Sequence, residues 1–224
     1  MEIIKSLIDL ILNLDENLFL MIQNYGVWVY AILFLIIFVE TGLVIMPFLP
    51  GDSLLFAAGA FCAGVVNDAG QTAELNLWFV LSLLTAAAII GDGLNYFFGK
   101  TIGLKALTWK IKGRQIVKQK YIDQTHKFYE KHGPKTIIIA RFVPIVRTFA
   151  PFVAGIGEMK YVKFLRFNII GGVAWVTGLT LMGYFFGNLP FVKKNFELVI
   201  FGIIGLSLLP MVYEIVRNKM KKAA

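Results

Sequence analysis

The segment ARFVPIVRTFAPFVAG, from Ala140 to Gly155, decides the fold of this chain. It places Arg141 and Arg147 among apolar residues and contains two prolines, Pro144 and Pro151. Proline lacks an amide N–H and disfavours a helical conformation in the residue before it, so a straight membrane helix is not expected here. Irregular backbone at membrane depth must be buried in protein or line a wet cavity. The segment therefore predicts a broken, re-entrant helix that carries two charges.

The composition indicates an integral membrane protein. The 224 residues, enough for one domain of ordinary size, are 58% hydrophobic with a mean hydropathy of +0.72. Only 16% are charged, whereas soluble proteins carry about 25%. The net charge of +8 does not indicate nucleic-acid binding, because the basic residues cluster between apolar runs and near the C-terminus. The single cysteine, Cys62, excludes an intramolecular disulfide, and Glu2 and Asp9 argue against a cleavable signal peptide.

The first part of the chain predicts three membrane-associated elements. Residues 1–24 carry apolar side chains at spacings of three and four, which is typical of an amphipathic helix lying in the interface. The apolar run Trp28–Met46 is long enough to cross about 30 Å and contains Glu40. The prolines and glycine of Pro47–Asp52 then break the helix. The apolar run Leu54–Val66 is too short for a full span and predicts one limb of a re-entrant segment.

The remaining part predicts three further spans in a single membrane domain, residues 25–216. The expected spans are Leu75–Gly99, Phe167–Val192 and Leu198–Tyr213. Residues 100–135 contain ten Lys or Arg residues and are expected in the cytoplasm by the positive-inside rule. Residues 217–224 form a basic tail that is also expected there. The two histidines lie in the hydrophilic loop and have no ligand spacing, so no metal site or cofactor is expected.

A weak internal repeat relates the two proline-broken segments. PFLPGDSLLFAAG begins at Pro47 and PIVRTFAPFVAG at Pro144; both end on Ala-Gly, and each precedes a YFFG tetrapeptide, at 96–99 and 184–187. With residues 100–135 and the C-terminus inside, the first segment enters from outside and the second from inside. The predicted fold is therefore an all-α integral membrane protein with inverted-topology repeats, each a re-entrant broken helix plus a transmembrane helix, with additional flanking helices.

Several ordered motifs over residues 25–190 resemble the DedA family of SNARE-associated, or VTT-domain, membrane proteins. They are E-x6-P-x2-P-G-D at Glu40–Asp52, G-D-x3-Y-x2-G at Gly91–Gly99, R-F-x-P-x2-R at Arg141–Arg147, F-x-A-G at Phe152–Gly155 and W-x7-G-Y-x2-G at Trp175–Gly187. Within the family, the chain is most similar to the proton-dependent enterobacterial-type members. The resemblance implies a bacterial inner-membrane flippase for polyprenyl phosphate carriers such as undecaprenyl phosphate. It also implies dependence on the proton motive force and a link to envelope integrity.

The charged residues of the two segments are the predicted site. Arg141 and Arg147 suit a lipid phosphate, because a guanidinium stays charged and binds phosphate oxygens bidentately. Glu40 and Asp52 are the predicted proton carriers. The alternative is that these four residues form ion pairs that hold the broken segments together. The motif residues assigned a structural role are Pro47, Pro50, Gly51, Gly59, Asp92, Pro144 and Gly155. Asp92 is interpreted as a helix-packing or capping residue, and Trp175, Tyr96 and Tyr184 as packing or interface aromatics.

Two other functions remain open at this point. One is a proton-coupled antiporter for small cations or drugs, in which the acids are indispensable and the arginines are not. The other is a non-transporting assembly factor, in which none of the four charged residues matters beyond protein level. An enzyme is not expected, because a lipid phosphatase needs a histidine nucleophile beside basic phosphate ligands. The sequence leaves open the exact lipid, the direction of transport, the proton stoichiometry and whether the chain forms a homo-oligomer.

Overall fold

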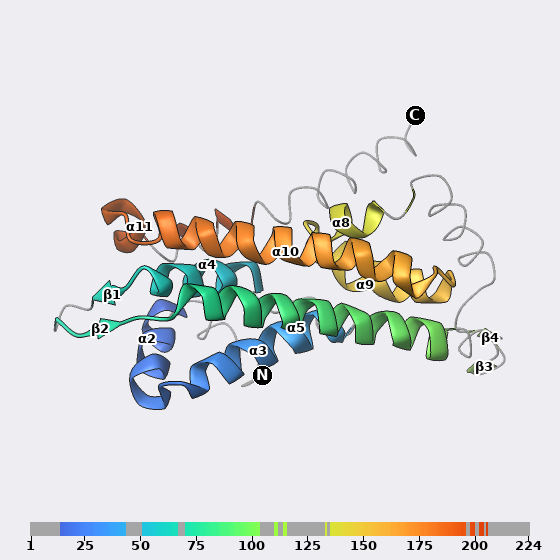
Figure 1. Cartoon of the computed structure of the whole chain (residues 1–224), viewed down its shortest axis with the longest axis horizontal. Helices are drawn as coiled ribbons and strands as arrows, with labels where there is room; N and C mark the ends of the chain where they lie inside the picture. The colour runs from blue at the N-terminus through green and yellow to red at the C-terminus, as the bar shows by residue number, and fades with distance from the viewer. Residues whose placement is uncertain are drawn as a thin grey trace. The chain divides into compact units, whose positions relative to one another are not determined.

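The computed structural model describes residues 14–43, 51–66, 70–103, 110–111, 114–115, 133, 135–195, 198–199, 202–203 and 205. The chain divides into two compact units. The first unit comprises residues 1–36, 48–85 and 176–224, and the second comprises residues 37–47 and 86–175. Most of the described residues are helical (Figure 1).

The helices follow the order expected from the apolar runs. They are α2 (Leu14–Tyr25), α3 (Trp28–Gly42), α4 (Gly51–Cys62), α5 (Leu77–Phe98), α8 (Thr136–Ala140), α9 (Pro144–Ile156), α10 (Tyr161–Phe186) and α11 (Pro190–Lys194). A π-helical turn, Gly99–Gly103, continues α5. The predicted last span, the basic residues 100–135 and the part of the predicted interfacial helix before Leu14 lie mostly outside the described residues.

The all-α prediction missed two short antiparallel ladders. Strand β1 (Val65–Val66) pairs with β2 (Thr72–Ala73), and β3 (Lys110–Ile111) pairs with β4 (Arg114–Gln115). Next to the first ladder, Gly64 and Gly70 adopt positive φ angles of 78° and 75°. Glycine adopts this left-handed conformation without steric cost, so both positions suit the changes of chain direction beside the ladder.

Two helices are long and apolar enough to cross a membrane. Leu77–Ile102 and Tyr161–Phe186 contain 26 residues each, about 39 Å of helix against a hydrocarbon core of about 30 Å. The predicted span Leu75–Gly99 is confirmed as α5 with its π-helical extension. The predicted span Phe167–Val192 is displaced: α10 begins six residues earlier, because its first turns carry exposed basic side chains that an apolar-run criterion leaves out.

Helix α3 is shorter than the span predicted from Trp28–Met46. Its 15 residues extend about 22 Å, less than the hydrocarbon thickness, and residues 44–50 lie outside the described part. In the first unit α3 starts beside the start of α5, where the Tyr30 hydroxyl accepts a hydrogen bond from the Asn76 N–H at 2.8 Å. Helix α4 ends at the same place, because the Phe61 carbonyl accepts from the Leu75 N–H at 3.1 Å. The start of α3 and the end of α4 therefore both lie beside the start of α5.

The break predicted in the arginine segment lies at Pro144. Helix α8 ends at Ala140, and Val143 is extended, with φ −117° and ψ 107°, before Pro144 opens α9. The break expected at Pro151 is absent, since α9 continues to Ile156. Proline inside a helix removes one N–H, and burial of the surrounding backbone in protein makes that loss tolerable at membrane depth. Pro151 is buried, consistent with that account.

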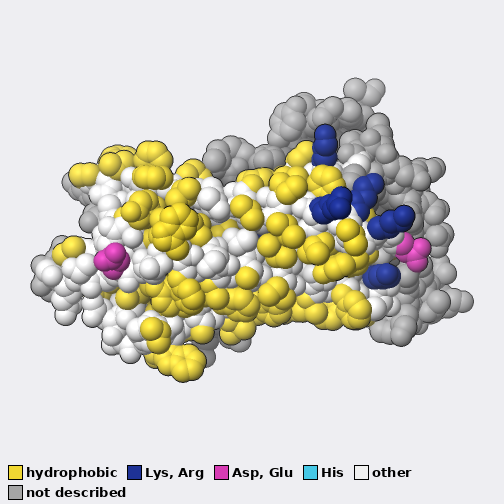
Figure 2. All heavy atoms as spheres, viewed as in Figure 1, with side chains coloured by type: hydrophobic (Ala, Val, Ile, Leu, Met, Phe, Trp, Pro, Cys, Tyr) yellow, Lys and Arg dark blue, Asp and Glu magenta, His cyan; other side chains and the backbone are white. Residues whose placement is uncertain are grey.

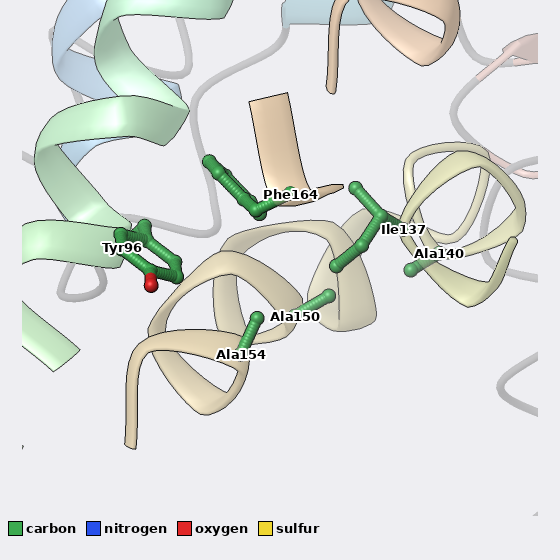
Figure 3. Close-up of a cluster of buried hydrophobic side chains, with 6 residues drawn as sticks. All are labelled: Tyr96, Ile137, Ala140, Ala150, Ala154 and Phe164. Carbon is green, nitrogen blue, oxygen red and sulfur yellow. The ribbon is translucent and has the colours of Figure 1, made fainter. Parts of the chain in front are cut away.

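A buried cluster holds the second broken segment to the long helices. Side chains from α5, α8, α9 and α10 converge in it (Figure 3): Tyr96, Ile137, Ala140, Ala150, Ala154 and Phe164. The rings of Tyr96 and Phe164 stack at 4.6 Å between centroids. The Tyr96 hydroxyl also donates to the carbonyl of Met159, which fixes the turn between α9 and α10.

Glycines allow α4 and α10 to touch in the first unit. A Cβ added at Gly59 would lie 2.0 Å from the Thr180 carbonyl oxygen, and one at Gly183 would lie 1.9 Å from that of Phe56. Each glycine therefore meets the carbonyl of the residue three positions before the other glycine. Only glycine fits at so close a contact between backbones.

The second unit contains the same reciprocal contact between α9 and the end of α5. A Cβ at Gly155 would lie 2.1 Å from the Tyr96 carbonyl oxygen, and one at Gly99 would lie 2.0 Å from that of Phe152. The structural counterpart of Gly99 is thus Gly183, whereas the repeated YFFG tetrapeptide aligns it with Gly187. The tetrapeptide alignment is one helical turn out of register.

Basic side chains gather at one end of the second unit, and apolar side chains cover much of the face in Figure 2. The exposed basic residues come from the turn after α5, the residue before α8 and the start of α10: Lys100, Lys135, Lys160, Lys163 and Arg166. Large apolar side chains such as Phe97 and Ile139 are more than half exposed. An outward apolar face with a basic rim is typical of a membrane protein.

Candidate functional site

Glu40 and Arg147 form a buried ion pair within the second unit. Glu40 lies in the last turns of α3 and is 0% exposed, while Arg147 lies in the first turn of α9 and is 7% exposed. The Arg147 guanidinium donates to the Glu40 carboxylate. An unpaired charge at this depth would be strongly destabilising, so each residue compensates the other. The pair joins the end of α3 to the start of α9.

Arg141 forms a second buried ion pair, with Asp92 of α5. Its guanidinium Nη2 also donates to the side-chain oxygen of Asn168 in α10, at 2.7 Å. The Asn168 amide in turn donates to the backbone carbonyl of Ile89 at 3.0 Å. Asp92 was interpreted from the sequence as a helix-packing or capping residue; the structure instead makes it the carboxylate partner of Arg141.

The position of Arg141 depends on two glycines of α10. A Cβ at Gly172 would lie 3.1 Å from Arg141 Nη1, and one at Gly171 would lie 3.3 Å from the Ile138 Cα. Side chains at these positions would push α8 and the guanidinium away from α10. The small residues therefore let the break between α8 and α9 approach the helix that supplies Asn168.

Both guanidiniums lie against the indole ring of Trp175. The Arg147 Cζ is 4.9 Å and the Arg141 Cζ 5.7 Å from the ring centroid, and Trp175 is 2% exposed. Cation–π contacts of this kind contribute about 2 kcal/mol or more when they are desolvated. The sequence interpretation of Trp175 as a packing aromatic missed this contact. Its position seven residues after Asn168, on the same face of α10, was the available signal.

Asn95 of α5 connects the two segments that carry the Glu40–Arg147 pair. Its amide donates to the backbone carbonyls of Thr41 in α3, at 3.2 Å, and of Thr148 in α9, at 2.7 Å. Asn95 is 0% exposed. Its position near the end of a predicted span indicated a close helix contact, but no sequence pattern identifies the two partners, because both are backbone atoms on other helices.

The other predicted site residues are distributed over both units. Asp52 lies in the first turn of α4, half-buried, in the first unit. Its role as a proton carrier together with Glu40 stays a prediction. Gly51 begins α4, and Gly59 and Gly155 lie at the helix contacts described above. Pro47 and Pro50 lie outside the described residues, as do both histidines. Among the residues that are described, no group of three His, Cys, Asp or Glu side chains could hold a metal ion.

This arrangement can exchange one oxyanion for another. Each guanidinium holds a carboxylate in a buried setting, and a phosphate offers the same donors more oxygen atoms and more negative charge. Loss of charge on a carboxylate would release its arginine for such a ligand.

Comparisons with known proteins identify the relatives of the chain. The VTT domain family matches residues 49–185. Protein DedA of Escherichia coli (strain K12) is 53% identical over 223 residues, which covers 100% of this chain and 98% of that protein. Inner membrane protein YghB of the same organism is 36% identical over 168 residues, 75% of this chain and 72% of that protein. An uncharacterized membrane protein of Mycobacterium leprae (strain TN) is 43% identical over 175 residues, 78% and 74% of the two chains. No solved structure matches.

Proposed function

Because the chain belongs to the DedA family of VTT-domain membrane proteins, we propose that it moves polyprenyl phosphate lipids, such as undecaprenyl phosphate, across the bacterial inner membrane. The observation that carries the proposal is the pair of buried guanidiniums, Arg141 and Arg147, on the indole of Trp175. Two fixed positive charges at one aromatic ring suit a ligand that is strongly anionic and must be desolvated.

In this proposal Arg141 and Arg147 bind the phosphate head group, and Glu40 occupies the guanidinium of Arg147 when no lipid is bound. The lipid phosphate competes with the carboxylate for the same donors. This exchange keeps a buried arginine paired in both states, which avoids the cost of an isolated charge in the membrane. Asp92 holds Arg141 in the same way.

We propose further that transport is coupled to the proton motive force through Glu40 and Asp52. A protonated carboxyl no longer competes for a guanidinium, so proton uptake favours lipid binding and proton release favours lipid departure. Support for a role of Glu40 comes from its complete burial in an ion pair, since ionisable residues inside a membrane are functional by default.

The proposed architecture is a pair of inverted-topology repeats, with the segment of α4 re-entering from outside and the segment of α8 and α9 from inside. The matching glycine contacts, Gly59 with Gly183 and Gly155 with Gly99, support equivalent helix crossings in the two repeats. Transporters of this kind place their site between the broken helices at the membrane midplane. In this orientation the basic rim of the second unit and the C-terminus face the cytoplasm.

Transport of labelled polyprenyl phosphate by the full chain in proteoliposomes tests the proposal. We expect transport in the presence of an imposed pH gradient and much less in its absence. Arg147→Lys keeps the charge but loses the bidentate fork, so the initial rate should fall by about tenfold while membrane abundance stays near normal. Full activity of the double variant Arg141→Lys and Arg147→Lys would count against phosphate binding by these residues. Transport that depends on the acids alone would favour a cation or drug antiporter.

A further inference from the structure

Asn95 is a fully buried polar residue that the proposed transport leaves without a role. Its side-chain nitrogen donates to two backbone carbonyls, those of Thr41 and Thr148. An amide NH2 group carries two hydrogens, so both are used. Because both partners are carbonyl oxygens, only the NH2 group and not the amide oxygen can bind them.

The two carbonyls belong to the residues that directly follow the ion pair. Thr41 follows Glu40 in α3, and Thr148 follows Arg147 in α9. The contacts therefore close a ring: from the Asn95 amide to the α3 backbone, through the ion pair to the α9 backbone, and back to the same amide. The backbone next to Glu40 and the backbone next to Arg147 are thus both hydrogen-bonded to the same atom, the side-chain nitrogen of Asn95.

Both hydrogen bonds of Asn95 lie near the end of a helix, where the backbone has fewer partners within its own helix. Thr41 is the next-to-last residue of α3, so its carbonyl is one of the last four of that helix, which have no N–H partner within it. Thr148 is near the start of α9, shortly after the break at Pro144. The side chains of Glu40 and Arg147 are long and flexible, so their pairing alone does not fix the separation of the two backbones.

The close approach of α3 to α5 makes the contact reachable. A Cβ added at Gly91 would lie 2.0 Å from the Thr41 hydroxyl oxygen, and the Gly91 Cα would lie 3.4 Å from a Cβ added at Gly42. Glycines at this crossing allow an asparagine one turn further along α5 to reach the α3 backbone.

We propose that Asn95 is the positioning residue of the Glu40–Arg147 pair: its amide sets the separation of α3 and α9, and it acts on transport only through that pair. Its effect on transport rests on the proposed function; its effect on the stability of the ring does not. The proposal predicts that replacing Asn95 lowers stability and transport while the Glu40–Arg147 pair is intact. Once the pair is altered, the same replacement should change either quantity little.

A double-mutant cycle in the full chain tests this coupling. Asn95→Leu keeps a similar size and removes both donors, and Arg147→Lys alters the pair. We expect Asn95→Leu alone to lower the melting temperature of the detergent-solubilised protein and to reduce the initial rate of polyprenyl phosphate transport by about tenfold or more. In the Arg147→Lys background the same substitution should add little to either loss, because contacting residues combine non-additively.

A matched control is Thr180→Val, which alters another fully buried polar residue outside the ring. The Thr180 hydroxyl has no hydrogen-bond partner among the residues that the structure describes. Its effects should add to those of Arg147→Lys. Additive effects of Asn95→Leu and Arg147→Lys, in either measurement, would overturn the proposal.

Two further arrangements keep the test decisive. If Asn95→Leu does not accumulate, Asn95→Gln takes its place in the cycle with the same criterion, since it keeps both hydrogens on a longer side chain. If the native protein moves no lipid phosphate, the proposed function fails, and the melting-temperature cycle still decides the role of Asn95.

Discussion

Glu40 and Arg147 are 107 positions apart in the chain and meet in a buried ion pair. The contact joins the end of α3 to the start of α9. An ion pair of these two residues, which the structural alternative predicted, is present; that it holds the two broken segments together stays a prediction. In the proposed transport the same pair would act as a gate that the lipid phosphate opens.

Trp175 should be required for transport because it contacts both guanidiniums. Trp175→Phe keeps an aromatic face and should retain part of the rate, whereas Trp175→Leu removes the cation–π contacts, worth about 2 kcal/mol or more when buried, and should abolish most of it. Initial rates in proteoliposomes at equal protein amounts measure the effect. Trp78→Leu, at a position that is 77% exposed, serves as the control. A native rate in Trp175→Leu would show that the indole does not organise the arginines.

Two glycines of α10 should respond oppositely to alanine. In Gly183→Ala the new methyl group would collide with the Phe56 carbonyl, so we expect a loss of about 1–3 kcal/mol in stability. In Gly178→Ala the methyl group enters open space in the same helix, and alanine favours a helix by about 1 kcal/mol over glycine. Melting temperatures of purified Gly183→Ala and Gly178→Ala test the two expectations. Equal temperatures would contradict the close crossing of α4 and α10.

The break and the charged segments could be predicted from the sequence, since proline and buried charge act locally. Pro144 disfavours a helical conformation in the residue before it, which predicts the break. Glu40 and Arg147 are recognisable because they are charged residues within apolar runs. The partners of Arg141 could not be predicted in this way. Asp92 and Asn168 reach it only because α5 and α10 pack against α8 at particular rotations, which glycines at 171 and 172 permit. The two partners of Asn95 could not be predicted for a similar reason, because they are backbone atoms that no sequence pattern identifies.

The alignment register of the two repeat copies could also not be predicted from the sequence. The YFFG tetrapeptides match by identity, yet the helix contacts equate Gly99 with Gly183. Contacts between helices select the residue that faces the partner, and a shift of four residues keeps the same face of a helix. An alignment by residue identity therefore selects the correct face of the helix, but places the equivalent glycine one helical turn away from the contact.

The proposed orientation can be tested by cysteine labelling in a Cys62→Ala background. Gln71→Cys lies in the connection between β1 and β2, and Lys120→Cys lies in the basic segment of residues 100–135. By the positive-inside rule a membrane-impermeant maleimide should label position 71 in intact cells, and position 120 only after the membrane is permeabilised. Labelling of both positions from the same side would remove the basis for inverted repeats.

The last prediction concerns proton coupling through Glu40 and Asp52. Glutamine and asparagine match the shapes of the two acids and keep an oxygen that accepts hydrogen bonds, but they do not titrate. Glu40→Gln and Asp52→Asn should therefore insert and fold, with Glu40→Gln less stable because it removes the negative charge opposite Arg147. Both variants should lose transport driven by a pH gradient, because a carboxyl that must hold and release a proton cannot be replaced by its amide. Binding of labelled polyprenyl phosphate to each purified variant separates two roles: retained binding with lost transport indicates coupling, and lost binding indicates recognition. Gradient-driven transport at the native rate in both variants would reject the proton-carrier role, and Glu40 would remain only the structural partner of Arg147.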